Sequence, residues 1–478
     1  MNNYEIVIGL EVHIQLKTKS KIWDSSDANY DDKAPNTCIT PTTVGEPGSL
    51  PKLNEEVLNY AIKAALALSC DINEISYFDR KNYFYPDSPK NYQITQFYKP
   101  YAQNGKLELK TSSGRDFVAE IERIQIEEDT AKSIHLDKET LLNFNRASMP
   151  LLEIITKPCF RSSDEAYAYL VALKERIKYT NISDVSMELG SLRCDANVSV
   201  KKTSDTVLGT RTETKNLNSF KAVVKAIEYE ANRQIELLEE GKRVVQETRL
   251  WDDENGVTRV MRSKEEAMDY RYFPEPDLPL VRITKDRIEK ISKTMPEFSD
   301  KKLVRYINEY DIKELEAKVL VSDMSLATYF ENLVALTKDA KKSSNWILTE
   351  VLRVLKEKNI DIDSFSIREN RLAELILLIN ENVISSKLAK EVFEIMLSTE
   401  DNPKKIVKDN NMGQVSNVNE IYELVKKVMD ENKEAVEDLK NGRDRAMKHL
   451  MGQAMKLSRG KANPKLVTDI INEEISKR

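Results

Sequence analysis

Hydrophobic and polar residues alternate without interruption over residues 4–16. The aliphatic positions are Ile6, Ile8, Leu10, Val12, Ile14 and Leu16, and the residues between them are Val7, Gly9, Glu11, His13 and Gln15. Because successive side chains of a strand point to opposite faces, this pattern predicts a strand with one buried face.

Shorter segments with strand or helix patterns continue to about residue 290. The further predicted strands are residues 117–126, 151–156, 196–200 and 257–261, and the predicted helices are residues 55–68, 164–179 and 220–240. Strands and helices do not alternate regularly along the chain. We therefore expect an α+β fold with an antiparallel sheet, and not a doubly wound sheet.

A proline-rich segment at residues 272–279 closes this region, and the pattern beyond it is almost wholly helical. Leu372, Leu375, Ile376 and Ile379 follow the spacing of one apolar helix face. A break near residues 399–403 precedes a last helical segment. The sequence thus predicts three domains: a mixed domain at 1–290, an all-α domain at 291–400 and a small helical tail at 401–478.

Composition narrows the class of protein. Of the 478 residues 40% are hydrophobic, which is enough to build cores, and the net charge of −6 means that nucleic-acid contact would need local basic patches. The four cysteines are far apart and form no CxxC pair, so we expect neither a disulfide framework nor a thiolate zinc site. No signal peptide or long apolar run is present, and we expect a soluble cytoplasmic protein without membrane contact.

Carboxylates are the main candidates for chemistry. Glu11 and His13 share one face of the first strand and could ligate a divalent metal or exchange protons. Glu153 is the single charge in the apolar run 150–155, where a carboxylate is costly to bury unless it is paired or bound to a cation. Residues 127–129 are three consecutive acids, and periodicity leaves the choice among them open. The alternative for Glu11 and His13 is a solvated sheet face. For Glu153 it is a buried ion pair, and for residues 127–129 it is a charged turn.

Absent motifs also guide the interpretation. There is no GxxxxGK[ST] loop and no GxGxxG after a strand, so a nucleotide would need a different cradle. No cysteine has a setting typical of an activated nucleophile, so we do not expect this chain to release ammonia from glutamine. The loop 79–96 combines aromatic and basic residues with prolines, which suits base stacking and phosphate contact, or else a well-packed surface loop.

The segment 440–465 is strongly basic within an acidic protein. Its cations are Lys440, Arg443, Arg445, Lys448, Lys456, Arg459, Lys461 and Lys465, against the single acid Asp444. Ala446, Leu450 and Ala454 could form the apolar stripe of a helix that keeps the cations outward. This pattern indicates contact with a phosphate backbone, with an ordinary solvated face as the alternative.

With these segments in view, the chain resembles from end to end the B subunits of the aspartyl/glutamyl-tRNA(Asn/Gln) amidotransferase family. The matching motifs are VIGLEVHIQL at 7–16, DRKNYFYPD at 79–87, EEDTAKS at 127–133, NRASMPLLEI at 145–154, ELGSLRCDAN at 188–197, DYRYFPEPD at 269–277, and GQAMK with GKANP at 452–464. Motifs of this length, in this order and over the whole chain, are highly specific.

The resemblance implies a cradle domain similar to the glutamine synthetase fold, followed by a helical domain and a helical tail. It also implies ATP-dependent phosphorylation of the side-chain carboxylate of Glu-tRNA(Gln) or Asp-tRNA(Asn), and then amidation by ammonia. The A subunit would supply the ammonia, and the C subunit would hold the assembly together. The misacylated tRNA and a non-discriminating aminoacyl-tRNA synthetase are the further expected partners.

The family's residues carry over to numbered positions. Its Mg²⁺ ligands map to Glu11, His13, Glu128 and Glu153, with Glu11, Glu128 and Glu153 as catalytic carboxylates, so the resemblance selects Glu128 among the three acids. Residues in motifs that line the ATP and substrate pocket are Lys81, Tyr83, Lys90, Arg193, Asp195, Glu213, Lys215 and Arg271. The expected tRNA-binding residues are Arg443, Arg445, Lys448, Lys456, Arg459 and Lys461.

One departure from the family concerns zinc. Some relatives carry a zinc knuckle, and the matching positions here are Asp24, Ser26, Thr40 and Thr43. We therefore expect no zinc and expect packing alone to hold this lobe. Two other functions compete with amidation: a tRNA-holding scaffold without chemistry of its own, and a free-standing amide ligase acting on a small amino acid. Whether ATP turnover requires acylated tRNA would distinguish them.

Overall fold

The computed structural model describes residues 3–263, 269–412, 418–440, 443–458 and 462–477. The chain divides into two compact units, Met1–Phe298 and Ser299–Arg478. The apolar core of the first unit shares no residue with the two apolar clusters of the second. The finer division into three domains stays a prediction.

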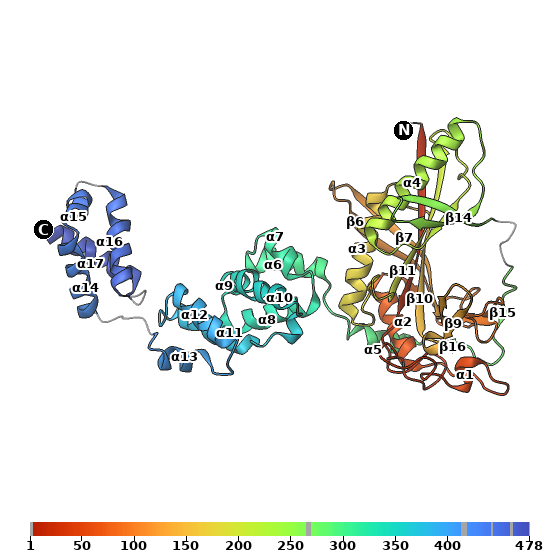
Figure 1. Ribbon diagram of the computed structural model, residues 1–478, viewed down its shortest axis with the longest axis horizontal. Coiled ribbons are helices and arrows are strands. Elements are labelled where there is room, and N and C mark those ends of the chain that lie inside the picture. Colours follow the sequence, from red (N-terminus) through yellow and green to blue (C-terminus); the bar gives the residue numbers. More distant parts are fainter. Residues whose placement is uncertain (1–2, 264–268, 413–417, 441–442, 459–461, 478) are drawn as a thin grey trace. The chain divides into compact units, whose positions relative to one another are not determined.

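The first unit is organised around a nine-stranded sheet (Figure 1). Its order is β14 (Val257–Ser263), β13 (Glu247–Asp252), β12 (Thr212–Lys215), β11 (Leu192–Lys202), β1 (Tyr4–Gln15), β10 (Pro150–Thr156), β7 (Asp116–Glu128), β6 (Ala102–Lys110) and β2 (Asp71–Ile72). The N-terminal strand β1 thus lies in the middle of the sheet, between β11 and β10. All five predicted strands are present, with bounds that differ by a few residues.

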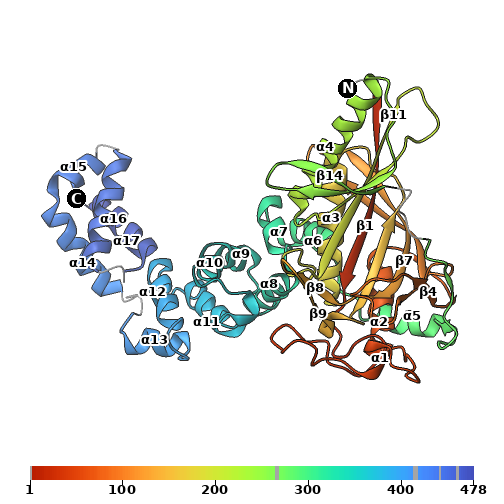
Figure 2. The same cartoon turned by 45° about the vertical axis from the view of Figure 1, so that its right-hand side comes forward.

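Three helices pack on one face of this sheet: α2 (Glu55–Ala67), α3 (Ser163–Thr180) and α4 (Phe220–Glu239) (Figures 1 and 2). Each starts at a residue whose side chain accepts a hydrogen bond from a backbone N–H of the first turn, namely Asn54, Ser162 and Ser219. The aliphatic face of β1 is buried among them, which confirms the predicted alternation. Burial of each such side chain contributes roughly 1.5–3 kcal/mol.

The sheet is mixed, which corrects the expectation of an antiparallel one. Among the described strand pairs, β12 and β13 run parallel and the other pairs run antiparallel. The reason is the connection between them, because α4 lies between β12 and β13 in the chain. A helical crossover returns the chain in the same direction, so the two strands become parallel.

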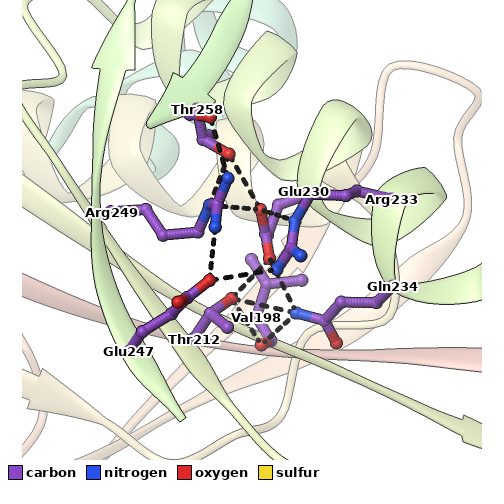
Figure 3. Close-up of polar contacts among 8 residues, drawn as sticks. All are labelled: Val198, Thr212, Glu230, Arg233, Gln234, Glu247, Arg249 and Thr258. Carbon is purple, nitrogen blue, oxygen red and sulfur yellow. Dashed lines mark hydrogen bonds and ion pairs between the residues drawn. The ribbon is translucent and has the colours of Figure 1, made fainter. Parts of the chain in front are cut away.

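A buried polar network fixes α4 to this end of the sheet (Figure 3). The carboxylate of Glu230 is fully buried and accepts hydrogen bonds from Thr212 Oγ1 at 2.7 Å, Thr258 Oγ1 at 3.1 Å and Arg233 Nε at 3.0 Å. Arg249 Nε lies 3.3 Å from the same carboxylate. The network therefore joins one helix to three strands, with Thr212 on β12, Arg249 on β13 and Thr258 on β14.

Smaller elements complete the first unit. A three-stranded sheet has the order β15 (Phe273–Pro274), β4 (Asp79–Asn82) and β5 (Tyr92–Thr95), and two strand pairs are β16 (Val281–Arg282) with β3 (Ile75–Ser76) and β8 (Lys132–His135) with β9 (Thr140–Asn143). The short helices are α1 (Pro41–Val44), α5 (Lys285–Ser292) and the 3₁₀-helix η1 (Phe144–Arg146).

The four positions that match the zinc knuckle of some relatives are joined by hydrogen bonds to one of them, Asp24. Asp24 accepts hydrogen bonds from Thr40 Oγ1 at 2.7 Å, from Thr43 Oγ1 at 2.6 Å, and from both the backbone N–H and the hydroxyl of Ser26. Burial would raise the pKa of Asp24, but these hydrogen bonds lower it overall. The lobe is thus held by hydrogen bonds as well as packing, which corrects the expectation of packing alone.

The second unit is helical. Its elements are α6 (Ser299–Tyr310), α7 (Glu314–Leu320), α8 (Met324–Thr337), α9 (Ala340–Trp346), the π-helix η3 (Ile347–Val351), α10 (Leu352–Lys358), the 3₁₀-helix η4 (Ile362–Ser364), α11 (Glu369–Asn380), α12 (Ser386–Met396), α13 (Pro403–Asp409), α14 (Val418–Glu431), α15 (Lys433–Lys440), α16 (Asp444–Leu457) and α17 (Pro464–Lys477). Leu372, Leu375 and Ile376 are fully buried, as their spacing predicts.

Two apolar clusters lie within this unit, one built from α6 to α13 and one from α14 to α17. Among the described helices, none is by itself long and apolar enough to cross a membrane. The bent pair Glu314–Leu320 and Met324–Thr337 meets the length and composition criteria only when the two are taken together.

Candidate active site

Three sequence-predicted residues meet on the open face of the large sheet. Glu11 and His13 alternate with the buried residues of β1, and Glu153 lies directly opposite His13 on the neighbouring strand β10. One ligand atom of each residue lies within 4.8 Å of those of the other two. His13 Nε2 is 3.7 Å from Glu153 Oε1. Two carboxylates and an imidazole at this spacing can hold a divalent metal ion.

A fourth group reaches this cluster from β7. Glu127 Oε1 lies 3.5 Å from His13 Nε2, and Glu127 Oε2 is buried without a hydrogen-bond partner among the described residues. Gln125, two positions earlier on the same face, donates a hydrogen bond to Glu153. An unpaired buried carboxylate oxygen is costly unless a cation meets it. We call Glu11, His13, Glu127 and Glu153 the acidic cluster.

The structure does not bring Glu128, the expected fourth ligand, to the acidic cluster. Glu128 lies on the opposite face of β7, where it accepts hydrogen bonds from Lys90 Nζ at 2.6 Å, Ile94 N at 3.0 Å and Ser148 Oγ at 2.9 Å. The physical reason is strand alternation, because the buried residues Ile124 and Ile126 share the face of Glu128. Extending that alternation by two residues would have placed Glu127, and not Glu128, on the face of His13.

Glu11, His13 and Glu153 of the acidic cluster line a cavity of about 710 Å³. Of the expected pocket residues, Lys81, Glu213 and Lys215 line this cavity. Tyr83, Lys90, Arg193, Asp195 and Arg271 are outside its lining. The cavity also contains residues that sequence patterns do not single out for a site, among them Phe97, Arg123, Tyr270 and Tyr272.

The expected residues outside the lining have other contacts. Asp195 accepts a hydrogen bond from Lys215 Nζ at 2.6 Å, and Arg193 forms an ion pair with Asp129. Tyr83 packs edge to face on Tyr270, with 6.3 Å between the ring centres. Lys90 is paired with Glu128, as described above, and Arg271 is exposed. Asp195 thus supports the cavity through Lys215, whereas Lys90 belongs to the opposite face of the sheet.

Charge is strongly perturbed in the cavity. Desolvation, together with the nearby Glu153 carboxyl, raises the pKa of Glu11 to about 8, and desolvation lowers the pKa of His13. Desolvation also raises the pKa of Glu127. For Lys81 burial acts to lower the pKa, but the carboxylates of Glu127 and Glu153 raise it overall. Several carboxylates lie close together here, and they favour the protonated, positively charged form of Lys81.

The structure describes part of the basic segment 440–465 of the tail. Arg443, Arg445, Lys448 and Lys456 are exposed, and Arg443 forms an ion pair with Asp438. Ala446, Leu450 and Ala454 are buried on α16, which confirms the predicted apolar stripe. Arg459 and Lys461 lie outside the described residues.

Comparison with known proteins identifies the family. Residues 6–289 match the description GatB/GatE catalytic domain, and residues 328–475 match the description GatB domain. The chain is 56% identical over 479 residues to the aspartyl/glutamyl-tRNA(Asn/Gln) amidotransferase B subunit of Fusobacterium nucleatum, in a match that covers 99% of this chain and 100% of the relative. The B subunits of Clostridium tetani and Caldicellulosiruptor bescii are 46% identical over 475 residues and 48% over 479, each with 99% of both chains covered. The chain therefore belongs to the family of aspartyl/glutamyl-tRNA(Asn/Gln) amidotransferase B subunits.

Proposed function

We propose that this chain carries the ATP-dependent half of tRNA-dependent amidation. The substrates would be Glu-tRNA(Gln), Asp-tRNA(Asn) or both, and the products Gln-tRNA(Gln) and Asn-tRNA(Asn). The names of the relatives supply the reaction class. The observation that supports the proposal is that Glu11, His13 and Glu153 line one cavity together with Lys81 and Lys215.

A divalent cation fits the acidic cluster. Glu11, His13, Glu127 and Glu153 would hold it, and a donor set dominated by carboxylates suits a hard ion such as Mg²⁺. The unpartnered buried oxygen of Glu127 supports this assignment. When bound, Mg²⁺ would neutralise phosphate charge and stabilise the transferring phosphoryl group.

The proposed reaction has two steps. First, a side-chain carboxylate oxygen of the aminoacyl-tRNA attacks the γ-phosphorus of ATP, and the bond from that phosphorus to the β,γ-bridging oxygen breaks as ADP leaves. Ammonia then attacks the acyl carbon, phosphate leaves, and the nitrogen gives up a proton. Lys81 and Lys215 line the cavity and would offset the negative charge of the phosphates. Asp195 and Glu213 hold Lys215, with Nζ–O distances of 2.6 and 3.0 Å.

The remaining components follow from the same proposal. The A subunit would provide ammonia from glutamine, the C subunit would hold the assembly, and a non-discriminating aminoacyl-tRNA synthetase would deliver the misacylated tRNA in the cytoplasm. The cations Arg443, Arg445, Lys448 and Lys456 support tRNA contact at the tail. The similarity of the first unit to the glutamine synthetase fold stays a prediction.

The test is amidation with free ammonium chloride, ATP and Mg²⁺. The wild type and Glu153→Gln would each be reconstituted with the A and C subunits and given Glu-tRNA(Gln) or Asp-tRNA(Asn), with glutamine hydrolysis followed separately. We expect Glu153→Gln to lose amidation and ATP turnover while glutamine is still hydrolysed. Glu228→Gln, an exposed change on α4, is the matched control. Full amidation by Glu153→Gln would contradict the proposal and favour the scaffold function.

A further inference from the structure

Thr248 on β13 is connected to the cavity through two other side chains, although it is outside the cavity's lining. Its hydroxyl donates a hydrogen bond to Glu213 Oε2 at 2.8 Å. The other oxygen of this carboxylate, Oε1, lies 3.0 Å from Lys215 Nζ. Glu213 and Lys215 both line the cavity. The hydroxyl of a buried residue is therefore linked to a cavity cation through a single carboxylate.

Lys215 is held by carboxylates from two strands. Asp195 on β11 accepts a hydrogen bond from Lys215 Nζ at 2.6 Å, and Glu213 precedes Lys215 by two positions on β12. The ammonium group ends a flexible four-carbon stem, so its position depends on the groups that accept its hydrogen bonds. The Glu213 carboxylate can itself turn about its side-chain bonds unless another group fixes it. The hydrogen bond from Thr248 supplies that constraint.

The pairing of β12 with β13 places Thr248 beside Glu213. The two strands run parallel, and Thr248 is the register partner of Glu213. Glu213 and Lys215 are half-buried, whereas Thr212 and Thr214, which alternate with them, are fully buried on the face that the helices cover. Thr248 therefore reaches the Glu213 carboxylate from the next strand, on the open face of the sheet.

The buried network of Figure 3 holds β13 from the opposite face. Arg249, the residue after Thr248, donates from Nε to Thr258 Oγ1 at 2.7 Å, and the same nitrogen lies 3.3 Å from Glu230. The pairing of β13 with β14 shifts its register between Thr248 and Arg249, as at a β-bulge. Bulges re-aim side chains and are common next to active sites. Successive residues of β13 are thus held from both faces of the sheet, Arg249 by α4 and β14 and Thr248 by Glu213.

We propose that Thr248 is a positioning residue for Lys215. Its hydroxyl orients the Glu213 carboxylate, and that carboxylate, together with Asp195, holds Lys215 Nζ at the cavity. The network around Glu230 and Arg249 keeps β13 in the register that this contact needs, since a slip of one residue would turn Thr248 to the other face. The kinetic consequence rests on the proposed function, in which Lys215 offsets phosphate charge. The geometric consequence does not depend on it.

The variants are Thr248→Val, which removes the hydroxyl, and Thr248→Ser, which keeps it. Thr203→Val is the matched control, because Thr203 is exposed and directly follows β11 of the same sheet. The first measurement is the rate at which a water-soluble acetyl ester of N-hydroxysuccinimide acylates Lys215 in the reconstituted complex, read by mass spectrometry. Burial acts to lower the pKa of Lys215, but Asp195 and Glu213 raise it overall. Weakening the contact with Glu213 therefore increases the fraction of reactive free amine.

We expect Thr248→Val to raise the acylation rate of Lys215 about 5-fold, the effect of losing one ordinary hydrogen bond, and Thr248→Ser to keep the wild-type rate. Lys21, which is fully buried, and Lys90, whose side chain is 9% exposed, are internal references in the same unit. Their rates should stay constant, because the effect is local. In amidation with ammonium chloride, Thr248→Val should lower kcat/KM for ATP about 10-fold, and Thr248→Ser should retain it.

The double variant Thr248→Val with Glu213→Gln tests whether Thr248 acts through Glu213, in which case it is acylated no faster than Glu213→Gln alone. The proposal is overturned if Thr248→Val leaves Lys215 acylation unchanged, if Thr248→Ser acts like Thr248→Val, or if Lys21 and Lys90 become equally reactive. Faster acylation with unchanged amidation would support the positioning role and count against the proposed function. Thr248→Ala replaces Thr248→Val if the valine variant does not fold.

Discussion

Glu127 on β7 lies 3.5 Å from His13 on β1, although the strand β10 runs between β7 and β1 in the sheet. The contact is possible because both side chains rise from the same face and lean over the intervening strand, where Glu153 lies opposite His13. The acidic cluster is therefore drawn from three adjacent strands. Its geometry depends on their register, since a slip of one residue would turn every side chain of a strand to the other face.

Glu127→Gln and Glu128→Gln should separate metal binding from structure. We expect Glu127→Gln to weaken Mn²⁺ binding, measured by electron paramagnetic resonance as a substitute for Mg²⁺, by at least about 10-fold. Glu128→Gln should leave metal affinity unchanged and destabilise the first unit, because it removes the charge paired with buried Lys90. Loss of Mn²⁺ binding in Glu128→Gln, but not in Glu127→Gln, would show that Glu128 is the ligand, as the family resemblance implies, and would contradict the assignment of Glu127.

Glu230→Gln should destabilise the end of the sheet that Figure 3 shows. The carboxylate is fully buried and contacts two arginines, Arg233 and Arg249, so breaking the network should cost about 3–5 kcal/mol. Thermal unfolding of the chain followed by tryptophan fluorescence would report the loss, because Trp251 lies on the adjoining strand β13. The exposed change Glu228→Gln should leave the transition in place. Equal transitions for both variants would mean that the buried charge is not needed.

Asp24→Ala should loosen the lobe that contains Trp23. Four hydrogen bonds converge on the Asp24 carboxylate, each worth about 1 kcal/mol net, so we expect a loss of roughly 2–4 kcal/mol. The same melting experiment with and without EDTA checks the basis of this stability. Because hydrogen bonds occupy the carboxylate, the chelator should not shift the unfolding temperature. A drop on adding EDTA would show that a metal supports the lobe.

Lys21 should make stability rise at alkaline pH. Its side chain is fully buried, Nζ donates to Cys38 O at 2.6 Å, and burial lowers its pKa to about 8 from the ordinary 10.5. Between these values the unfolded chain binds more protons than the native one, so the free energy of unfolding increases with pH. The gain is complete above pH 10.5, is lost as the pH falls through 8, and amounts to at most about 3 kcal/mol.

The control for this prediction is Lys21→Met, which keeps the apolar stem and removes the titrating group. Urea unfolding of both proteins at intervals from about pH 7 to pH 10.5 gives the difference in unfolding free energy. That difference should move in favour of the wild type as the pH rises. A constant difference over the whole range would contradict the lowered pKa.

Local patterns predicted five strands and three helices of the first unit to within a few residues, but not its shorter elements. The alternation in β1 placed Glu11 and His13 on the open face, and the apolar run around Glu153 indicated a carboxylate that needs a partner. What sequence patterns could not supply was strand order. The pairing of β1 with β10 and β11 joins segments far apart in the chain, and no local pattern encodes such partners.

The remaining differences also have identifiable causes. The parallel pair β12 and β13 follows from the crossover α4, which the sequence predicted as a helix without indicating where the chain returns. The position of Glu127, and not Glu128, beside His13 follows from one more step of the strand alternation. The aromatic residues Phe97, Tyr270 and Tyr272 come from two separate loops and meet only in the folded cavity.

The central place of β1 in the sheet also determines when, during synthesis, this strand can be paired on both edges. On the ribosome β1 is complete after residue 15, but its partner β11 is complete only after residue 202. At roughly 5–20 residues per second, the first strand waits for about 10–40 s before both of its edges can be paired. The large sheet thus cannot form in the order in which the chain emerges, and its first strand depends on a partner strand that is made much later. Chaperones that bind nascent apolar segments should act on this protein through its N-terminal strand.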